Sequence, residues 1–351
     1  PLTHTTDGHD VLDLPGGASN VTHGEGVRRG IGYAVGIKNI GFSEGFDDYS
    51  TARARIQIVN GEPVVEIHTA AAEVGQGLVT LKGQIARTEL GVQRVVVHVS
   101  DTQVGSAGST SASRQSYVTG GAVQTACKAL RDDILLLAME KLGHLHPHLL
   151  HFRSQYRLVD GEIRDSEGHL VTSLADLLKD KTLEATREYR HRPTTPIDPI
   201  TGQGLPHAQF SFAGHRAVVD VDTETGLIKV VEMAIVQDVG KAMNPQAVEG
   251  QLEGGSAQGL GLAVLEEIQV VDGKVKNPSF TDYLIPTVLD MPPVKSVMLE
   301  YADEHAPYGL RGVGESPTIS STPAIVSAIR QATGLPLNRV PVRPEHITQT
   351  I

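Results

Sequence analysis

The residues best suited to chemistry lie in a glycine-rich stretch near the C-terminus, residues 307–317, which reads Pro-Tyr-Gly-Leu-Arg-Gly-Val-Gly-Glu-Ser-Pro. Three glycines and two prolines surround a single acid, Glu315. Glycine has no Cβ and tolerates positive φ, so such a loop can hold a carboxylate close to other backbone. A carboxylate positioned in this way could act as a general base. An incidental acid in a surface turn gives the same pattern, so both interpretations are open for this stretch alone.

Three other stretches combine small residues with a side-chain amide or hydroxyl. They are residues 73–77 (Glu-Val-Gly-Gln-Gly), 109–115 (Ser-Thr-Ser-Ala-Ser-Arg-Gln) and 251–259 (Gln-Leu-Glu-Gly-Gly-Ser-Ala-Gln-Gly). We place each at or near a helix start, where bare backbone N–H groups favour anions and polar ligands. Glutamine can both donate to and accept from the edge of a heterocycle. Each stretch alone is typical of an ordinary helix start, but together with Glu315 they predict a large polar cofactor and one proton-transfer group.

These motifs, in this order, resemble the molybdopterin-binding subunit of the xanthine dehydrogenase/aldehyde oxidase family. The series also includes Thr-Gly-Gly at residues 119–121, Asp-Val-Gly at 238–240 and Asn-Pro at 244–245. The resemblance runs from about Gly30 to the C-terminus and is strongest to the catalytic subunit of bacterial xanthine dehydrogenases. It covers only the family's second molybdenum-cofactor domain. We therefore expect the hammerhead domain and the first cofactor domain on another chain or on a removed N-terminal part.

The resemblance implies a role for particular residues. Glu315 matches the family's general base. Side chains and backbone of three loops match cofactor contacts: Gln76, Gly77, Ala112, Ser113, Arg114 and Gln258. The two glutamines match residues that hydrogen-bond the pterin, and residues 112–114 match a loop along the cofactor and the edge of the metal ligands. The family's metal is held by the dithiolene of the pterin, so no protein side chain is expected to ligate it.

The implied activity is oxidative hydroxylation of a purine such as xanthine, with water as the oxygen source. Glu315, ionised, would accept a proton from the hydroxyl at the metal centre. The implied cofactor is molybdenum–molybdopterin, as the mononucleotide or the cytosine dinucleotide, with iron–sulfur clusters and FAD on partner chains. The implied partners are a chain or segment carrying the first molybdenum-cofactor domain, an iron–sulfur subunit, an FAD subunit and a small-molecule substrate.

Three other functions stay open at this point. The substrate could be another N-heterocycle, similar to nicotinate, or it could be an aldehyde. The chain could also be a non-catalytic scaffold subunit that has kept the fold, although the presence of Glu315 and both glutamines argues against this. Carbon monoxide oxidation ranks lower, and the cofactor loop that distinguishes it belongs to the missing half.

Composition limits the class of protein. The 351 residues are 40% hydrophobic and 20% charged, which predicts a globular chain, and the net charge of −11 without a basic run argues against nucleic acid. The longest apolar run, Ile134–Met139, is far shorter than the roughly 20 residues of a membrane span. Cys127 is the only cysteine, which excludes an internal disulfide and fits a cytoplasmic location. The chain does not begin with Met, so we expect it to be processed, trimmed or one piece of something longer.

The pattern of elements predicts an α+β fold made of two mixed α/β subdomains. Hairpins are expected at Asn60-Gly61 and Asp160-Gly161, and a third at residues 223–226. Helices are expected at 77–91, from about 121 onward, at 244–261 and at 320–333. We divide the chain into a polar tail or linker (1–27), a first subdomain (28–142), a connector (143–206) and a second subdomain with the catalytic loop (207–351).

Two features invite a functional interpretation that the sequence does not favour. Cys127 lies on the apolar stripe of the long helix, which predicts a buried core thiol. Four histidines near the end of that helix suggest a metal site: His144, His146, His148 and His151. Pro147 interrupts the segment, and no acid or cysteine joins the cluster, so we interpret it as an exposed loop.

Overall fold

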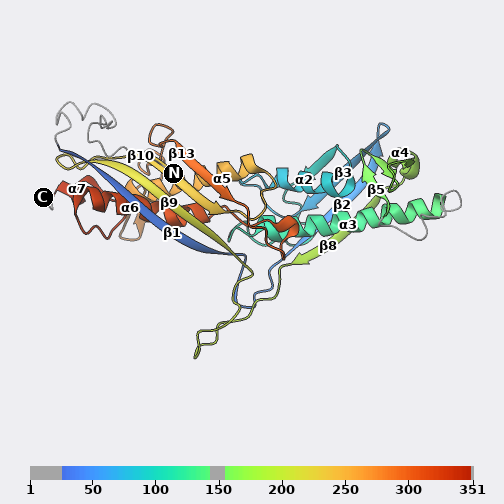
Figure 1. The fold of residues 1–351 in the computed structure, drawn as a ribbon, viewed down its shortest axis with the longest axis horizontal. Helices are drawn as coiled ribbons and strands as arrows, with labels where there is room; N and C mark the ends of the chain where they lie inside the picture. The colour runs from blue at the N-terminus through green and yellow to red at the C-terminus, as the bar shows by residue number, and fades with distance from the viewer. Residues whose placement is uncertain (1–25, 143–154, 349–351) are drawn as a thin grey trace.

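The computed structural model describes residues 26–142 and 155–348 of the chain. The predicted tail up to residue 25 and the four histidines between 144 and 151 lie outside the described residues. The described chain is elongated, with two α/β units side by side along its long axis (Figure 1). The predicted α+β class with two mixed subdomains is confirmed.

The unit on the right of Figure 1 has a four-stranded sheet in the order β4-β3-β2-β8, with helices α2 and α3 against one face. Its main elements are β2 (Tyr49–Val59), β3 (Glu62–Thr69), α2 (Leu78–Leu90), β4 (Val95–His98), α3 (Gln115–Leu142) and β8 (Leu183–Arg190). A small sheet and a short helix follow α3: β5 (Arg157–Val159), β6 (Glu162–Arg164), β7 (Leu170–Ser173) and α4 (Leu174–Leu178). Cys127 is fully buried in the core between this sheet and α3, as predicted.

The unit on the left has a four-stranded sheet in the order β1-β9-β10-β13, with α5 and α6 against one face. Its main elements are β1 (Val27–Ile40), β9 (Gln209–Asp222), β10 (Ile228–Asp238), α5 (Pro245–Val264), β13 (Val294–Leu299) and α6 (Ser316–Thr333). Short strands and short helices complete it: β11 (Val270–Val271), β12 (Lys274–Val275), the 3-10 helix η4 (Pro307–Gly309) and α7 (Pro344–Thr348).

Local sequence explains where these elements turn. The β2–β3 hairpin turns on Asn60 and Gly61, whose φ angles of 54° and 82° match the two left-handed residues of a type I′ turn. Helix α2 lies between Gly77 and Gly91, both left-handed. The central strand β9 pairs along its length with β1 and β10, so it is almost continuously buried.

Alternating glycines bring α6 unusually close to β1. A Cβ added to Gly30 or Gly32 would lie 2.1 Å from a backbone carbonyl oxygen of α6, so no larger residue fits at either position. Side chains alternate along a strand, so Lys38 lies on the same face of β1 as these glycines. Lys38 therefore lies on the face of β1 that packs against α6, near the N-terminal end of this helix.

The strand pairing divides the chain differently from the sequence prediction. β1, which we assigned to the first subdomain, pairs with β9 in the left unit. β8, which we assigned to the connector, pairs with β2 in the right unit. The unit to which each strand belongs is decided by pairing between residues far apart in the sequence. The order of residues along the chain does not indicate this pairing. We keep two α/β units as the proposed division, with these two strands exchanged.

The helix expected at 244–261 is confirmed as α5, so residues 251–259 lie inside this helix and not at its start. Two other helices begin earlier than predicted. Helix α6 begins directly after Glu315 and not at residue 320, and α3 begins at Gln115. The strands β11 and β12 form a hairpin with only two residues in each strand. Glycine-rich sequence led to the placement of residues 251–259 at a helix start, whereas these glycines serve close packing inside α5.

The proline-rich segment 193–206 projects from the middle of the body (Figure 1). Ile200 in this segment is 92% exposed. No helix of the described residues combines the length and the hydropathy needed to cross a membrane.

Candidate active site

Glu315 is the N-cap residue of α6, at the junction of the two units. Its Oε1 accepts a hydrogen bond from the backbone N–H of Ala112 at 3.0 Å, and its own N–H donates to Ser113 Oγ at 3.1 Å. Its Oε2 lies 3.1 Å from Lys38 Nζ, while 43% of the side chain stays exposed. The carboxylate is thus held from two sides and still open to a ligand.

Ala112 and Ser113 adopt a backbone conformation that side chains with a Cβ rarely take. Their φ angles are 55° and 51°, two consecutive left-handed residues without a glycine. The carbonyl oxygen of Ala112 accepts from the N–H of Gly41 at 3.0 Å. A Cβ on Gly312 would lie 2.0 Å from the carbonyl oxygen of Ser113, so the loop that precedes Glu315 also contacts this turn. Strain of this kind persists where surrounding contacts enforce it, and it is concentrated at functional sites.

Sequence reasoning missed Lys38. Arg311 is the cation nearest to Glu315 in the sequence, but its Nε lies 3.1 Å from Asp238 Oδ2 and its Nη1 donates to the carbonyl of Phe210 at 2.7 Å. Arg311 therefore fixes the loop, and Lys38 supplies the charge beside the acid. Lys38 is an even number of residues from Gly30 and Gly32, so the sequence could have placed all three on one face of the strand. Nothing in the sequence indicated that α6 covers that face.

The loop before Glu315 is fixed by the motif at 238–240. A Cβ on Gly240 would lie 2.5 Å from the carbonyl oxygen of Gly309, and Gly240 forms an isolated bridge with Leu310. Gln209 Nε2 donates to the carbonyl of Leu310 at 3.0 Å, and Gln237 Nε2 donates to that of Val313 at 3.3 Å. Gly240 and the two glutamine amides, which are far from Glu315 in the sequence, therefore hold the loop that carries Glu315.

The loop of Gln76 and Gly77 is organised around the carboxylate of Glu73. This carboxylate accepts from the N–H groups of Gly75, Gly77 and Val79 at 2.9, 3.1 and 2.8 Å. Partial burial raises the pKa of Glu73, but the three backbone donors outweigh burial and hold the pKa below its ordinary value. Gln76 Oε1 accepts from Val74 and its Nε2 donates to the carbonyl of Ala72, so its amide is held in place at the surface of the loop.

Gln258 lies on α5, not in a loop. Its Oε1 accepts from Thr318 Oγ1 at 3.0 Å, in the first turn of α6, and its side chain is exposed. Gln251, two turns earlier on the same face, lies 3.3 Å from the position of a Cβ on Gly314. The glutamine-bearing face of α5 therefore borders the loop that carries Glu315.

Arg114 does not present its side chain to the site. Its guanidinium is fully buried, with Nε 2.6 Å from Asp48 Oδ1 and further bonds to the carbonyls of Ala107 and Tyr49. Its place in the family's motif therefore corresponds here to a positioning role: it anchors the turn that contains Ala112 and Ser113.

A cavity of about 90 Å³ lies where these motifs meet. Its lining includes Gln76 and Gly77 from the α2 loop, Gln115 at the start of α3, Gln251 of α5 and Val313 of the loop before Glu315. Glu315 and Gln258 are beside it and do not line it. The structure thus brings together four of the sequence motifs that lie far apart along the chain.

The donor set fits a polar heterocycle. The side-chain amides of Gln115, Asn244 and Gln251 line the cavity, and an amide can both donate to and accept from the edge of a heterocycle. None of the described residues that line the cavity is a cysteine or a histidine, so a metal here would rely on ligands brought by the cofactor itself.

Comparison with known proteins identifies the class. The molybdopterin cofactor-binding domain matches residues 16–292. A probable xanthine dehydrogenase subunit of Bacillus subtilis (strain 168) is 31% identical over 330 residues, covering 93% of this chain and 42% of the relative. The xanthine dehydrogenase molybdenum-binding subunit of Escherichia coli O157:H7 is 31% identical over 309 residues, covering 84% of this chain and 39% of the relative.

The fold agrees with this class. Quinoline 2-oxidoreductase from Pseudomonas putida 86 superposes with a TM-score of 0.75 at 28% identity, over 94% of this chain and 42% of that one. The chain belongs to the molybdopterin cofactor-binding family of xanthine dehydrogenase and aldehyde oxidase enzymes. It spans about two fifths of the length of the curated relatives it matches.

Proposed function

We propose that this chain forms the second half of the cofactor site of a molybdenum hydroxylase and supplies its general base, Glu315. The observation that carries the proposal is the position of this carboxylate. It caps α6 beside a cavity bordered by the family's motifs, and it is held by the N–H of Ala112 and by Lys38. The side chain is held in one orientation and is still 43% exposed, so the carboxylate is open to a bound ligand.

The chemistry of the chain's own residues follows from this geometry. Lys38 pairs with the Glu315 carboxylate through one oxygen, and the N–H of Ala112 fixes the other. The carboxylate, oriented in this way, can accept a proton from the attacking hydroxyl in the transition state. The bound molybdopterin would supply the oxygen transfer and the two-electron oxidation. Gln76 and Gly77 would hold it from the α2 loop, Gln258 from α5, and the Ala112–Ser113 turn along its edge.

The proposed substrate is an electron-poor N-heterocycle, with a purine such as xanthine first. Two of the relatives named above carry xanthine in their names, and the structural neighbour carries quinoline, which is also an N-heterocycle. An aldehyde is the alternative. Turnover of the assembled complex on xanthine, quinoline, nicotinate and benzaldehyde distinguishes these substrates, and preference for benzaldehyde would remove the purine assignment.

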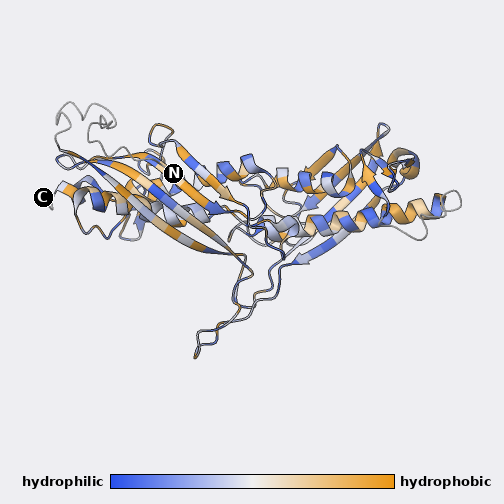
Figure 2. Cartoon of the chain, viewed as in Figure 1, coloured by the Kyte–Doolittle hydropathy of each residue, from blue (hydrophilic) through white to orange (hydrophobic). Residues whose placement is uncertain are grey.

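We also propose that a partner chain or segment completes the site. The left unit exposes apolar side chains of adjacent strands on the sheet face away from α6: Tyr33, Val35, Ile37, Phe212, Val236 and Val297. Orange strands on the left of Figure 2 show the apolar character of this sheet. Iron–sulfur and FAD subunits, the dinucleotide form of the pterin and a cytoplasmic location stay predictions from the family resemblance.

The test of Glu315 is the Glu315→Gln variant in the assembled complex. Glutamine keeps the shape of the side chain and its contact with Ala112 but cannot act as the base. We expect normal molybdenum content and a turnover per molybdenum that is lower by about 100-fold or more. The measurement is turnover divided by bound molybdenum.

The matched control is Glu345→Gln in α7, at the far end of the left unit, which should leave this ratio unchanged. If Glu315→Gln retains near-normal turnover per molybdenum, Glu315 is not the base. If the Glu315→Gln variant loses cofactor but keeps normal turnover per remaining molybdenum, the role of Glu315 is structural.

A further inference from the structure

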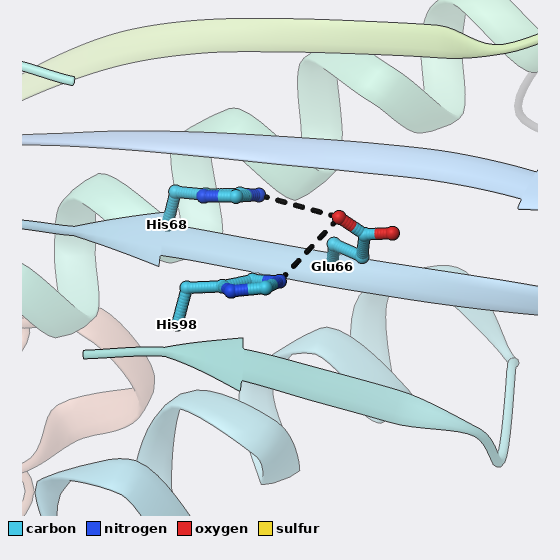
Figure 3. A group of neighbouring side chains, drawn as sticks. All are labelled: Glu66, His68 and His98. Atoms are coloured by element: carbon cyan, nitrogen blue, oxygen red, sulfur yellow. Dashed lines mark ion pairs between the residues drawn. The ribbon is translucent and has the colours of Figure 1, made fainter. Parts of the chain in front are cut away.

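Three side chains of metal-binding type lie together in the right unit, away from Glu315. Glu66 and His68 are on β3, two residues apart, so they share one face of the sheet. His98 on β4 is the register partner of His68 in the parallel β3–β4 pair. Figure 3 shows both imidazole rings directed toward the carboxylate of Glu66.

The distances match the ligand shell of a small divalent ion. Glu66 Oε2 lies 3.5 Å from His68 Nε2 and 3.4 Å from His98 Nε2. Tetrahedral zinc with ligands at its usual bond lengths separates neighbouring ligand atoms by about 3.3–3.5 Å. The three ligand atoms all lie within 4.8 Å of one another. A shared ion requires the partly exposed His98 ring to turn so that its Nε2 approaches that of His68.

His68 is already prepared as a ligand. Its Nδ1 lies 2.8 Å from Asp101 Oδ2, within hydrogen-bond distance. When Nδ1 donates its proton to this carboxylate, Nε2 carries the lone pair of the ring. Only 10% of the His68 side chain is exposed, and within the described residues its Nε2 is buried without a hydrogen-bond partner. Metal-binding histidines usually have such a carboxylate behind them, which fixes the tautomer and the ring.

Glu66 and His98 complete the arrangement. Gln57 Nε2 donates to Glu66 Oε1 at 2.6 Å and leaves Oε2 directed at the two rings. The His98 side chain is 43% exposed, compared with 16% for Glu66, so an ion can enter from the side of His98. The two rings stack at 4.2 Å with an angle of 9° between their planes. Two imidazolium rings at this separation would repel each other, whereas two neutral rings can both ligate.

We propose that Glu66, His68 and His98 bind one zinc ion, with water as the fourth ligand. The site ties β4, the edge strand of the sheet, to its neighbour β3. Two imidazoles and one carboxylate are ligands that zinc accepts, and three protein ligands leave one position for water. This site is independent of the proposed hydroxylase function, because it shares no residue with the Glu315 site.

Zinc binding to the purified full chain tests the proposal directly. We expect one zinc per chain by elemental analysis and by competition with a chromophoric chelator. Cobalt(II) substituted for zinc should show the visible bands of tetrahedral coordination. Glu66→Gln and His98→Gln should each weaken zinc binding by roughly 100-fold or more. Asp101→Asn should weaken it by about 10- to 100-fold, the usual scale when the carboxylate behind a ligand is lost.

The matched control is His169→Gln. His169 is exposed and lies 3.3 Å from Asp165 and 3.5 Å from Glu167, so it is another histidine between two acids but without a buried ring. This variant should bind zinc as the wild type does. Thermal melts without zinc show whether each variant is folded. Wild-type affinity in both ligand variants, or no zinc binding by the wild-type chain, would overturn the proposal and leave a hydrogen-bonded histidine–carboxylate network.

Discussion

At the scale of residues, the candidate site depends on backbone conformations as much as on side chains. In the left-handed pair Ala112–Ser113, the N–H of Ala112 donates to the Glu315 carboxylate, and Gly312 allows the loop before Glu315 to approach this pair. Motif matching located Glu315, Gln76 and the 112–114 turn, because these residues sit in recognisable small-residue strings. It did not locate Lys38 or the internal role of Arg114, because both depend on which element packs over a given face.

His215 makes the stability of the left unit depend on pH. This β9 side chain is buried, with Nδ1 2.8 Å from Ser320 Oγ on α6 and Nε2 2.9 Å from Ser256 Oγ on α5. Burial lowers the pKa of His215 to about 4. Because the unfolded chain has a histidine pKa of about 6.5, it takes up the proton first. The stability from neutral His215 is fully present above about pH 6.5 and is lost as the pH falls toward 4.

We therefore expect the free energy of unfolding to fall by about 2 kcal/mol between pH 7 and pH 5 through this residue. Urea unfolding of the wild type and of His215→Gln at both pH values measures the effect, and the variant should lose most of this pH dependence. His169→Gln, an exposed histidine, serves as the control. An unchanged pH dependence in His215→Gln would contradict the burial argument.

At the scale of elements, small residues join α5 to α6. A Cβ on Gly259 would lie 1.7 Å from Ser321 Oγ, and one on Gly255 would lie 2.7 Å from Pro317 Cβ. Thr322 Oγ1 donates to the carbonyl of Gly259 at 3.0 Å across the same contact. The sequence prediction placed these glycines in the expected helix 244–261, but it also described residues 251–259 as a loop near a helix start, because glycine usually interrupts a helix. The helix is confirmed, and the close packing of α6 against α5 explains the glycines, which only the tertiary structure shows.

Two glycines of α5 allow a direct test of this contact. Gly259→Ala should destabilise the chain by about 1–3 kcal/mol, because the added methyl group overlaps Ser321. Gly254→Ala, in the same helix with nothing within 4 Å of its added Cβ, should be neutral or stabilising by up to about 1 kcal/mol. Urea midpoints of the two variants check this. Equal urea midpoints for the two variants would mean that the close contact between α5 and α6 does not contribute to stability.

At the scale of the whole molecule, the exposed sheet face of the left unit should control association. Val35 is 87% exposed in the centre of its apolar outer face. Because apolar patches of this kind associate in water, the chain without its partner should self-associate. It should also bind no molybdenum cofactor, because it carries only half of the proposed site. Val35→Lys should reduce this association, as measured by sedimentation velocity.

Val288→Lys is the matched control for that experiment. Val288 is equally exposed, at 86%, but lies in the segment between β12 and β13, outside the paired strands of the sheet. It should associate as the wild type does. Stoichiometric cofactor on the isolated monomer would contradict the need for a partner.

The pairing of β1 with β9 has a consequence for how the chain is built. Ile40, the last residue of β1, is the register partner of Gln209, the first residue of β9. Everything between them, including the whole right unit, is therefore an insertion at the tip of what would otherwise be a simple hairpin. The left unit is discontinuous in sequence but continuous in space, and a short turn joining residue 40 to residue 209 would make it a single module. Glu315 lies on the host module, whereas the Ala112–Ser113 turn that fixes its carboxylate belongs to the inserted one.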